Sequence, residues 1–134
     1  MNWGFRLYLM ETETDFLLAV LRQAPHGSLW LLSTDSWKEV PRVLGPDLLH
    51  TDNLHWHVRI TSANRDRLLA LAEAYELPER VVHMSLTTAQ GHTFFRGEDH
   101  LDTIICDIDF QDLRRVCRQF PNLELSIVEM EGPL

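Results

Sequence analysis

The chain has 134 residues and a formal net charge of −8 at pH 7, with 45% hydrophobic and 24% charged residues. This length and composition are typical of one globular domain, so we expect a single domain over residues 1–134 and exclude wholesale disorder. The acidic surplus disfavours nucleic acid and anionic membranes as partners, because both reward Lys and Arg, and it favours a basic protein partner.

The first part of the chain predicts a strand, a helix and a second strand. Residues 3–10 alternate apolar side chains with others, as in a half-buried strand. Thr12 or Thr14 is a suitable N-cap for a helix whose apolar stripe spans residues 16–24 and which stops at a proline. Residues 28–33 are apolar on both faces, which is typical of a central strand.

The pattern is weak in the next part. Asp35 or Ser36 is expected to cap a short helix that runs through Val43 and is broken by a Gly-Pro pair. Residues 54–60 alternate again and predict a strand with one buried face. Ser62 is the expected N-cap of the helix that follows.

The second half of the chain alternates clear strand patterns with one clear helix pattern. The helix pattern has apolar residues at positions i, i+3, i+4 and i+7, which form one stripe. The expected elements are a hairpin over 81–88 and 92–96, a strand over 102–108 with Asp109 as the next cap, a helix over 113–120 and a strand over 123–130.

A repeated segment indicates the fold class. Residues 17–25 return as residues 113–121 with five of nine positions identical, and each copy ends at a proline between two strand-like runs. We therefore expect an α+β fold with a mixed β-sheet of about six or seven strands, helices mainly on one face and repeated βαβ units. A ferredoxin-like arrangement with additions is one topology that fits this pattern.

The cysteines and the N-terminus indicate a compartment. The N-terminal run lacks the features of a signal peptide, and no apolar stretch approaches the roughly 20 residues of a spanning helix. Cys106 and Cys117 fall at inward positions of a predicted strand and helix, without a metal-ligand spacing. Reduced thiols in the core are typical of the cytoplasm, so we expect a cytoplasmic protein.

Four polar residues predict an alternative metal site. His55 and His57 are two residues apart on one strand, and Asp107 and Asp109 share that spacing on another. If these strands were neighbours, two imidazoles and two carboxylates would surround Zn²⁺ or another divalent metal. The competing interpretation is a half-solvated sheet face without a metal, in which Asp109 caps a helix. No other cofactor is expected.

Recognised catalytic motifs are absent from the sequence. It contains no nucleophile elbow, no phosphate-binding glycine loop and no dinucleotide fingerprint. This absence favours a non-catalytic role and leaves a small metal-dependent enzyme as an alternative.

Acidic side chains are concentrated near the C-terminal end. Residues 98–112 contain six Asp and Glu residues and no Lys or Arg. Such a patch speeds encounter with a basic partner and pairs with its Arg and Lys groups. Among the tryptophans, Trp37 is the one we expect at the surface, as an interface anchor. The residues expected to bind a partner are Glu98, Asp99, Asp102, Asp107, Asp112 and Trp37.

Small size, surplus acid and absent catalytic motifs resemble the general character of bacterial immunity proteins and antitoxins that mask a toxin, although the sequence has no motif of a specific family. We expect an inhibitor of this type, whose carboxylates mimic the phosphates that a basic toxin or nuclease binds. Two alternatives stay open. One is the metal-binding protein or metal-dependent enzyme, and the other is a ligand-sensing regulatory domain that forms a homodimer and binds a metabolite between its subunits.

Overall fold

The computed structural model describes residues 2–35, 37–51, 55–107, 111–120 and 127–130, with the backbone alone for 2–12, 50–51, 111–112, 114, 117 and 127–130. Its helices are α1 (Asn2–Gln23), α2 (Val40–Leu44), α3 (Arg65–Ala74), α4 (Leu77–Arg80) and α5 (Gln111–Arg118), with a 3-10 helix η1 (Gly45–Asp47) after α2. Its strands are β1 (Leu29–Thr34), β2 (Leu48–Thr51), β3 (Trp56–Arg59), β4 (Val81–Thr87), β5 (Thr93–Glu98), β6 (Thr103–Asp107) and β7 (Ile127–Met130).

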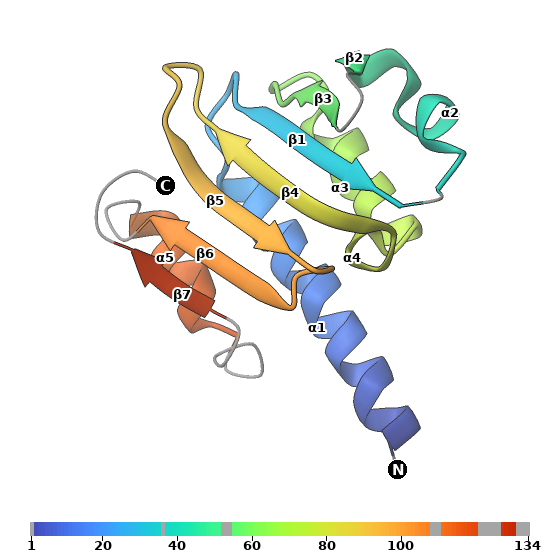
Figure 1. The fold of residues 1–134 in the computed structure, drawn as a ribbon. Coiled ribbons are helices and arrows are strands. Elements are labelled where there is room, and N and C mark those ends of the chain that lie inside the picture. Colours follow the sequence, from blue (N-terminus) through green and yellow to red (C-terminus); the bar gives the residue numbers. More distant parts are fainter. Residues whose placement is uncertain (1, 36, 52–54, 108–110, 121–126, 131–134) are drawn as a thin grey trace.

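The strands form one sheet in the order β2-β3-β1-β4-β5-β6-β7 (Figure 1). Six of them pair antiparallel, and β7 adds to β6 in parallel, so the sheet is mixed. β3 and β4 both pair antiparallel with β1, which lies between them. The α+β class is confirmed, whereas the ferredoxin-like arrangement of repeated βαβ units is not, because β6 and β7 are the one parallel pair among the described strands.

The predicted strand at residues 3–10 is wrong, because these residues belong to α1. Phe5 and Leu9 alternate with other residues, but they also lie four residues apart, so they satisfy a helical stripe as well. No proline interrupts the chain before residue 25, so the helix runs on without a break. Thr12 and Thr14 are therefore interior helical residues and not N-caps.

The residues at the starts of α2 and α3 also differ from the predicted N-caps. α2 starts after Glu39 and not after Asp35, while Ser36 lies outside the described residues. Before α3, the Thr61 amide donates to Asn64 Oδ1 at 2.9 Å, and the Asn64 amide donates to Thr61 Oγ1 at 3.3 Å. Thr61 thus satisfies the Asn64 amide, which Ser62 was expected to satisfy.

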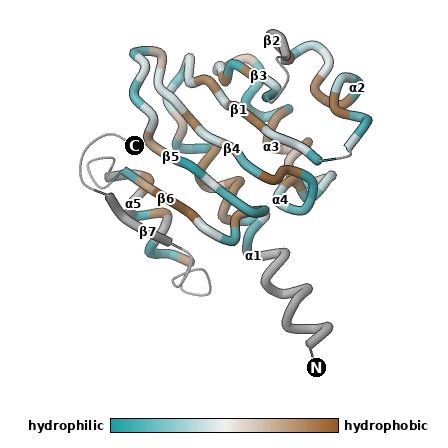
Figure 2. Tube along the Cα trace, in the orientation of Figure 1, coloured by the Kyte–Doolittle hydropathy of each residue, from teal (hydrophilic) through white to brown (hydrophobic). Residues whose placement is uncertain are grey.

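The hydrophobic core lies between the sheet and the helices that cover one of its faces, as Figures 1 and 2 show for α1, α3, α4 and α5. One register row of this face joins five neighbouring strands and is fully buried. Phe16 of α1 packs on it, 6.1 Å from the Phe95 ring between centroids. The row consists of Val58, Trp30, Leu86, Phe95 and Cys106.

Cys106 is thus in the core as predicted, while the Cys117 side chain lies outside the described residues. In the described part of the chain, no helix combines the length and the apolar character that crossing a membrane requires.

Candidate functional site on the open sheet face

The second face of the sheet carries mostly polar side chains. In the described part of the chain, Figure 1 shows no helical layer over this face. Successive residues of a strand point to opposite faces, so this face is formed by the residues between the core positions. One register row across it consists of His57, Leu31, Ser85, Arg96 and Ile105. The adjacent row includes Ser33, His83, Glu98 and Thr103.

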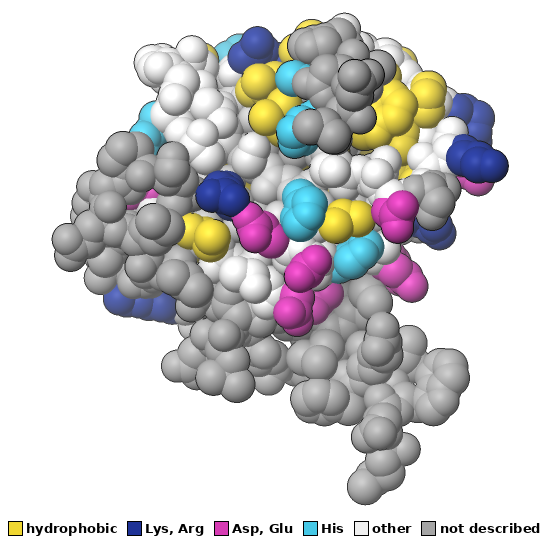
Figure 3. All heavy atoms as spheres, viewed as in Figure 1, with side chains coloured by type: hydrophobic (Ala, Val, Ile, Leu, Met, Phe, Trp, Pro, Cys, Tyr) yellow, Lys and Arg dark blue, Asp and Glu magenta, His cyan; other side chains and the backbone are white. Residues whose placement is uncertain are grey.

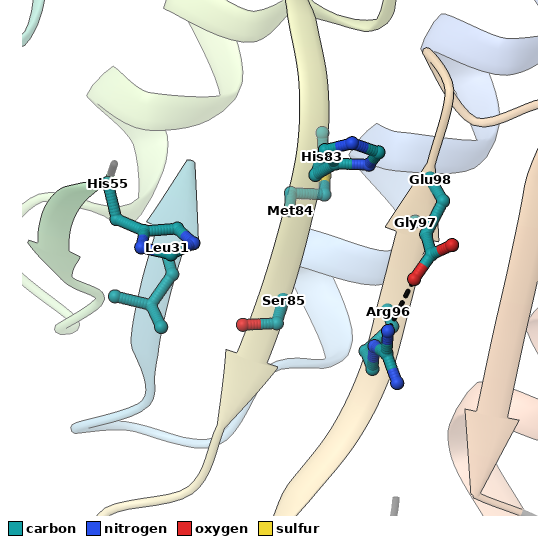
Figure 4. Close-up of a pocket in the computed structure, with 8 residues that line it drawn as sticks. All are labelled: Leu31, His55, His83, Met84, Ser85, Arg96, Gly97 and Glu98. Atoms are coloured by element: carbon teal, nitrogen blue, oxygen red, sulfur yellow. Dashed lines mark hydrogen bonds and ion pairs between the residues drawn. The ribbon is translucent and has the colours of Figure 1, made fainter. Parts of the chain in front are cut away.

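A hollow of about 410 Å³ lies on this face over β1, β4 and β5 (Figure 4). Its floor includes the apolar side chain of Leu31. In Figure 4, His55 lies beyond Leu31 on one side, and His83 extends over β4 toward Glu98 on the other. Glu98 forms an ion pair with Arg96 at the β5 side of the hollow. Met84, Ser85 and Gly97 complete its lining.

The turn between β5 and β6 has an uncommon backbone. Asp99, His100 and Leu101 are three successive non-glycine residues with positive φ, at 51°, 59° and 67°. This left-handed conformation costs roughly 1–2 kcal/mol for each L-residue, so the surrounding structure must hold it. The positive φ angles therefore show that contacts around this turn stabilise a backbone conformation that these residues do not favour by themselves.

Three contacts hold the turn. The His100 amide donates to the carbonyl of Val82 at 2.9 Å. The His100 ring donates from Nδ1 to the carbonyl of Pro78, also at 2.9 Å, and this fixes the position of its proton. Leu101 is only 1% exposed and packs against Gly97, where a Cβ atom would overlap the leucine side chain.

A second hollow, of about 420 Å³, lies beside this turn and contains Trp37. The Trp37 ring packs against Tyr75 at 5.7 Å, and the Arg80 guanidinium lies 5.8 Å from its centroid. Trp37 is therefore half-buried and held by an aromatic and a cationic neighbour. The residues that line this second hollow are Asp35, Trp37, Lys38, Glu39, Glu79, Arg80 and His100.

The structure brings together part of the predicted partner surface. Glu98, Asp99 and Asp102 share the β5–β6 turn, and Asp99 and Asp102 are exposed. His100, from the same turn, also lines the hollow that contains Trp37. Figure 3 shows acidic and histidine side chains gathered beside one another on this view of the molecule. We refer below to Glu98, Asp99 and Asp102 as the acidic turn.

Asp107 does not belong to this surface, which corrects the prediction. It lies at the opposite end of β6 from the acidic turn and is only 1% exposed. Its Oδ2 is hydrogen-bonded to Nε2 of His92, which precedes β5. The Asp112 side chain, also predicted for this surface, lies outside the described residues.

The structure does not assemble the predicted metal site. His55 and His57 are at β3, Asp107 is in β6, and the strands β1, β4 and β5 lie between them. Neighbouring strands are about 4.8 Å apart, so these groups are separated by roughly 19 Å. Asp109 lies outside the described residues, and among those described no group of three His, Cys, Asp or Glu residues could hold a metal ion.

Two polar pairs were not foreseen, because their partners are distant in the sequence. One is His92 with Asp107. The other joins η1 to α3, where Arg67 bonds Asp47 through two nitrogens, at 2.5 and 2.9 Å. The hydrogen bond and the charge of Asp47 raise the pKa of Arg67 above its ordinary value, so the guanidinium stays charged. Asn64 also donates to Asp47, at 3.0 Å.

Comparison with protein-family models, curated proteins and solved structures found no match to this chain. Function is therefore inferred from the open sheet face, the acidic turn and the two hollows.

Proposed function

We propose that this protein is a non-catalytic, acidic protein-binding module, most concretely an inhibitor of the immunity or antitoxin type that masks a basic toxin or nuclease. The observation that supports this best is the acidic turn, which places three carboxylates at and beside the left-handed residues 99–101 at the end of β5, next to the open sheet face. A turn fixed before binding loses little conformational entropy when a partner arrives.

The mechanism we propose is electrostatic masking. The net charge of −8 attracts a basic protein over long range, and the acidic turn then pairs with the Arg and Lys groups of its active face. Carboxylates in this role replace the phosphates that a nuclease would bind. The half-buried Trp37, beside the same turn, would add an aromatic anchor at the rim.

We also propose a cytoplasmic location, in which the buried Cys106 acts as an apolar core residue. The metal-dependent alternative is not carried forward, because β3 and β6 are not neighbours.

The test measures association with a basic partner recovered from the cell extract. The variant Glu98→Gln, Asp99→Asn, Asp102→Asn removes three charges and keeps the side-chain shapes. We expect it to slow association about tenfold, and we expect 0.5 M salt to slow the wild type similarly, because screening shortens the range of the attraction to a few ångströms.

A matched control removes three charges from the helical layer, with Asp66→Asn, Glu73→Gln and Glu76→Gln, all of which are exposed. This control should slow association much less, since these residues lie on the covered side of the sheet. Equal effects of the two variants would show that net charge alone acts. An affinity that neither salt nor the first variant changes would exclude electrostatic masking.

A further inference from the structure

The hollow on the open sheet face combines one positive and one negative group at its rim. Arg96 and Glu98 are two residues apart on β5, so their side chains point to the same face and form an ion pair. Both remain accessible, with 46% and 36% of their side chains exposed. An ion pair this exposed contributes only about 0–1 kcal/mol, so a ligand can open it at little cost.

The rest of the described lining contains no Asp, Glu, Lys or Arg. Leu31 and Met84 are apolar, Ser85 carries a hydroxyl, and the other described lining residues are Gly97 and two histidines. Arg96 and Glu98 are therefore the one basic and the one acidic residue among the described residues that line the hollow, apart from its histidines. A phosphate or a polyamine would leave one rim charge facing a like charge, whereas a molecule with both charges would match both groups.

We propose that this hollow binds a small zwitterion of the free amino-acid class that has an apolar side chain. Its carboxylate would accept hydrogen bonds from Arg96, and its ammonium would donate to Glu98. Arg96 and Glu98 would then each pair with the ligand in place of one another. The apolar side chain would lie over Leu31 toward His55. A volume of about 410 Å³ is within the range of small-molecule sites.

This inference goes beyond the proposed function and does not depend on it, since the zwitterion needs no protein partner. The two are linked through Glu98, which belongs both to the hollow and to the acidic turn. An occupied hollow therefore withholds one of the three carboxylates from a basic partner.

The test is a titration of the ¹⁵N-labelled protein with L-phenylalanine, followed by amide chemical shifts. We expect saturable shifts of the Ser85, Arg96 and Gly97 amides with a dissociation constant on the order of a millimolar. N-acetyl-L-phenylalanine lacks the ammonium, and L-phenylalanine amide lacks the carboxylate. Each should bind about tenfold more weakly. Equal binding of either analogue, or no saturable shift, would overturn the proposal.

Variants supply the second arm. Arg96→Gln and Glu98→Gln should each weaken L-phenylalanine binding about tenfold, while their well-dispersed spectra report that the fold is kept. The control is Arg59→Gln, an exposed arginine of β3 that does not line the hollow. If Arg59→Gln weakens binding as much as the rim variants do, the ligand is not held by the Arg96–Glu98 pair.

Discussion

Gly97 has no side chain at the point where Leu101 packs against β5. A methyl group there would overlap the leucine, which is buried and has little room to move. We expect Gly97→Ala to destabilise the protein by about 1–3 kcal/mol, which is typical of overpacking. Urea unfolding followed by circular dichroism measures this change as a lower midpoint with an unchanged slope.

The matched control is Glu73→Ala, on the exposed surface of α3. Surface substitutions of this kind change stability little, so this change should shift the free energy of unfolding by less than about 0.5 kcal/mol. If both alanine variants unfold at the same urea concentration, Gly97 is not required for the packing of Leu101.

Asp107 gives the second prediction at the residue scale. Its buried side chain is hydrogen-bonded to His92, and Asn in its place exchanges a hydrogen bond to a carboxylate for a weaker one to an amide. We expect Asp107→Asn to lower the free energy of unfolding by about 1–3 kcal/mol. The exposed Asp102→Asn should change it by less than about 0.5 kcal/mol. Equal stability of the two variants would show that the His92–Asp107 pair contributes nothing.

Asp107 also shows what a sequence pattern leaves undetermined for one residue. Its position on β6 predicts a polar side chain on the open face, and the run of acids around it predicts a surface. Its burial follows from contact with His92, and that contact depends on how the β4–β5 hairpin meets the end of β6. Cys106, whose burial depends only on its own strand alternation, was predicted correctly.

At the scale of elements, the β5–β6 turn gives a prediction with two readouts. Asp99 has φ 51°, and glycine adopts such angles without steric cost. Asp99→Gly should remove the roughly 1–2 kcal/mol that the left-handed conformation costs. Glycine also loses more conformational entropy on folding, so the net gain in stability should be about 0.5–1 kcal/mol. The same change removes one charge from the acidic turn, so association with a basic partner should slow.

Thermal unfolding and association rates together check this prediction. The control Asp99→Asn removes the charge but keeps a residue that tolerates left-handed angles, so it should slow association without the gain in stability. A loss of stability in Asp99→Gly would show that the Asp99 side chain stabilises the turn.

The elements with one strong local signal were predictable. The hairpin of β4 and β5 and the helix α5 lie where alternation and the i, i+3, i+4, i+7 stripe placed them. The start of α1 was not, because Phe5 and Leu9 fit both a strand and a helix. Where two periods fit the same residues, helix propensity and the absence of a breaker decide, and alternation alone misleads.

At the scale of the whole molecule, the sequence pattern does not determine the order of the strands in the sheet, so it could not predict which residues of distant strands meet. The metal hypothesis required the strands of His55 and Asp107 to be neighbours, and three strands lie between them. The acidic turn needed no such knowledge, since its residues are consecutive in the chain or nearly so. Sites built from one turn are therefore predictable from sequence, while sites that span several strands depend on long-range pairing.

The last prediction concerns the charge of the entire chain. Seven histidines accompany the net charge of −8, and their full protonation would bring the formal charge to −1. Imidazoles commonly take up protons between pH 8 and pH 5, whereas Asp and Glu stay largely ionised there. The long-range attraction of a basic partner should therefore weaken as pH falls, and the association rate at pH 5.5 should be about tenfold below that at pH 7.5.

Stopped-flow association at both pH values measures this effect, with circular dichroism as the check that the fold persists at pH 5.5. The partner contributes its own titration, so a synthetic peptide of arginines, whose charge is constant over this range, serves as the reference ligand. Raising the salt to 0.5 M should remove the difference between the two pH values, because it screens both charge states alike. A pH dependence that survives high salt would mean that local hydrogen bonds of particular histidines, and not the charge of the whole molecule, control binding.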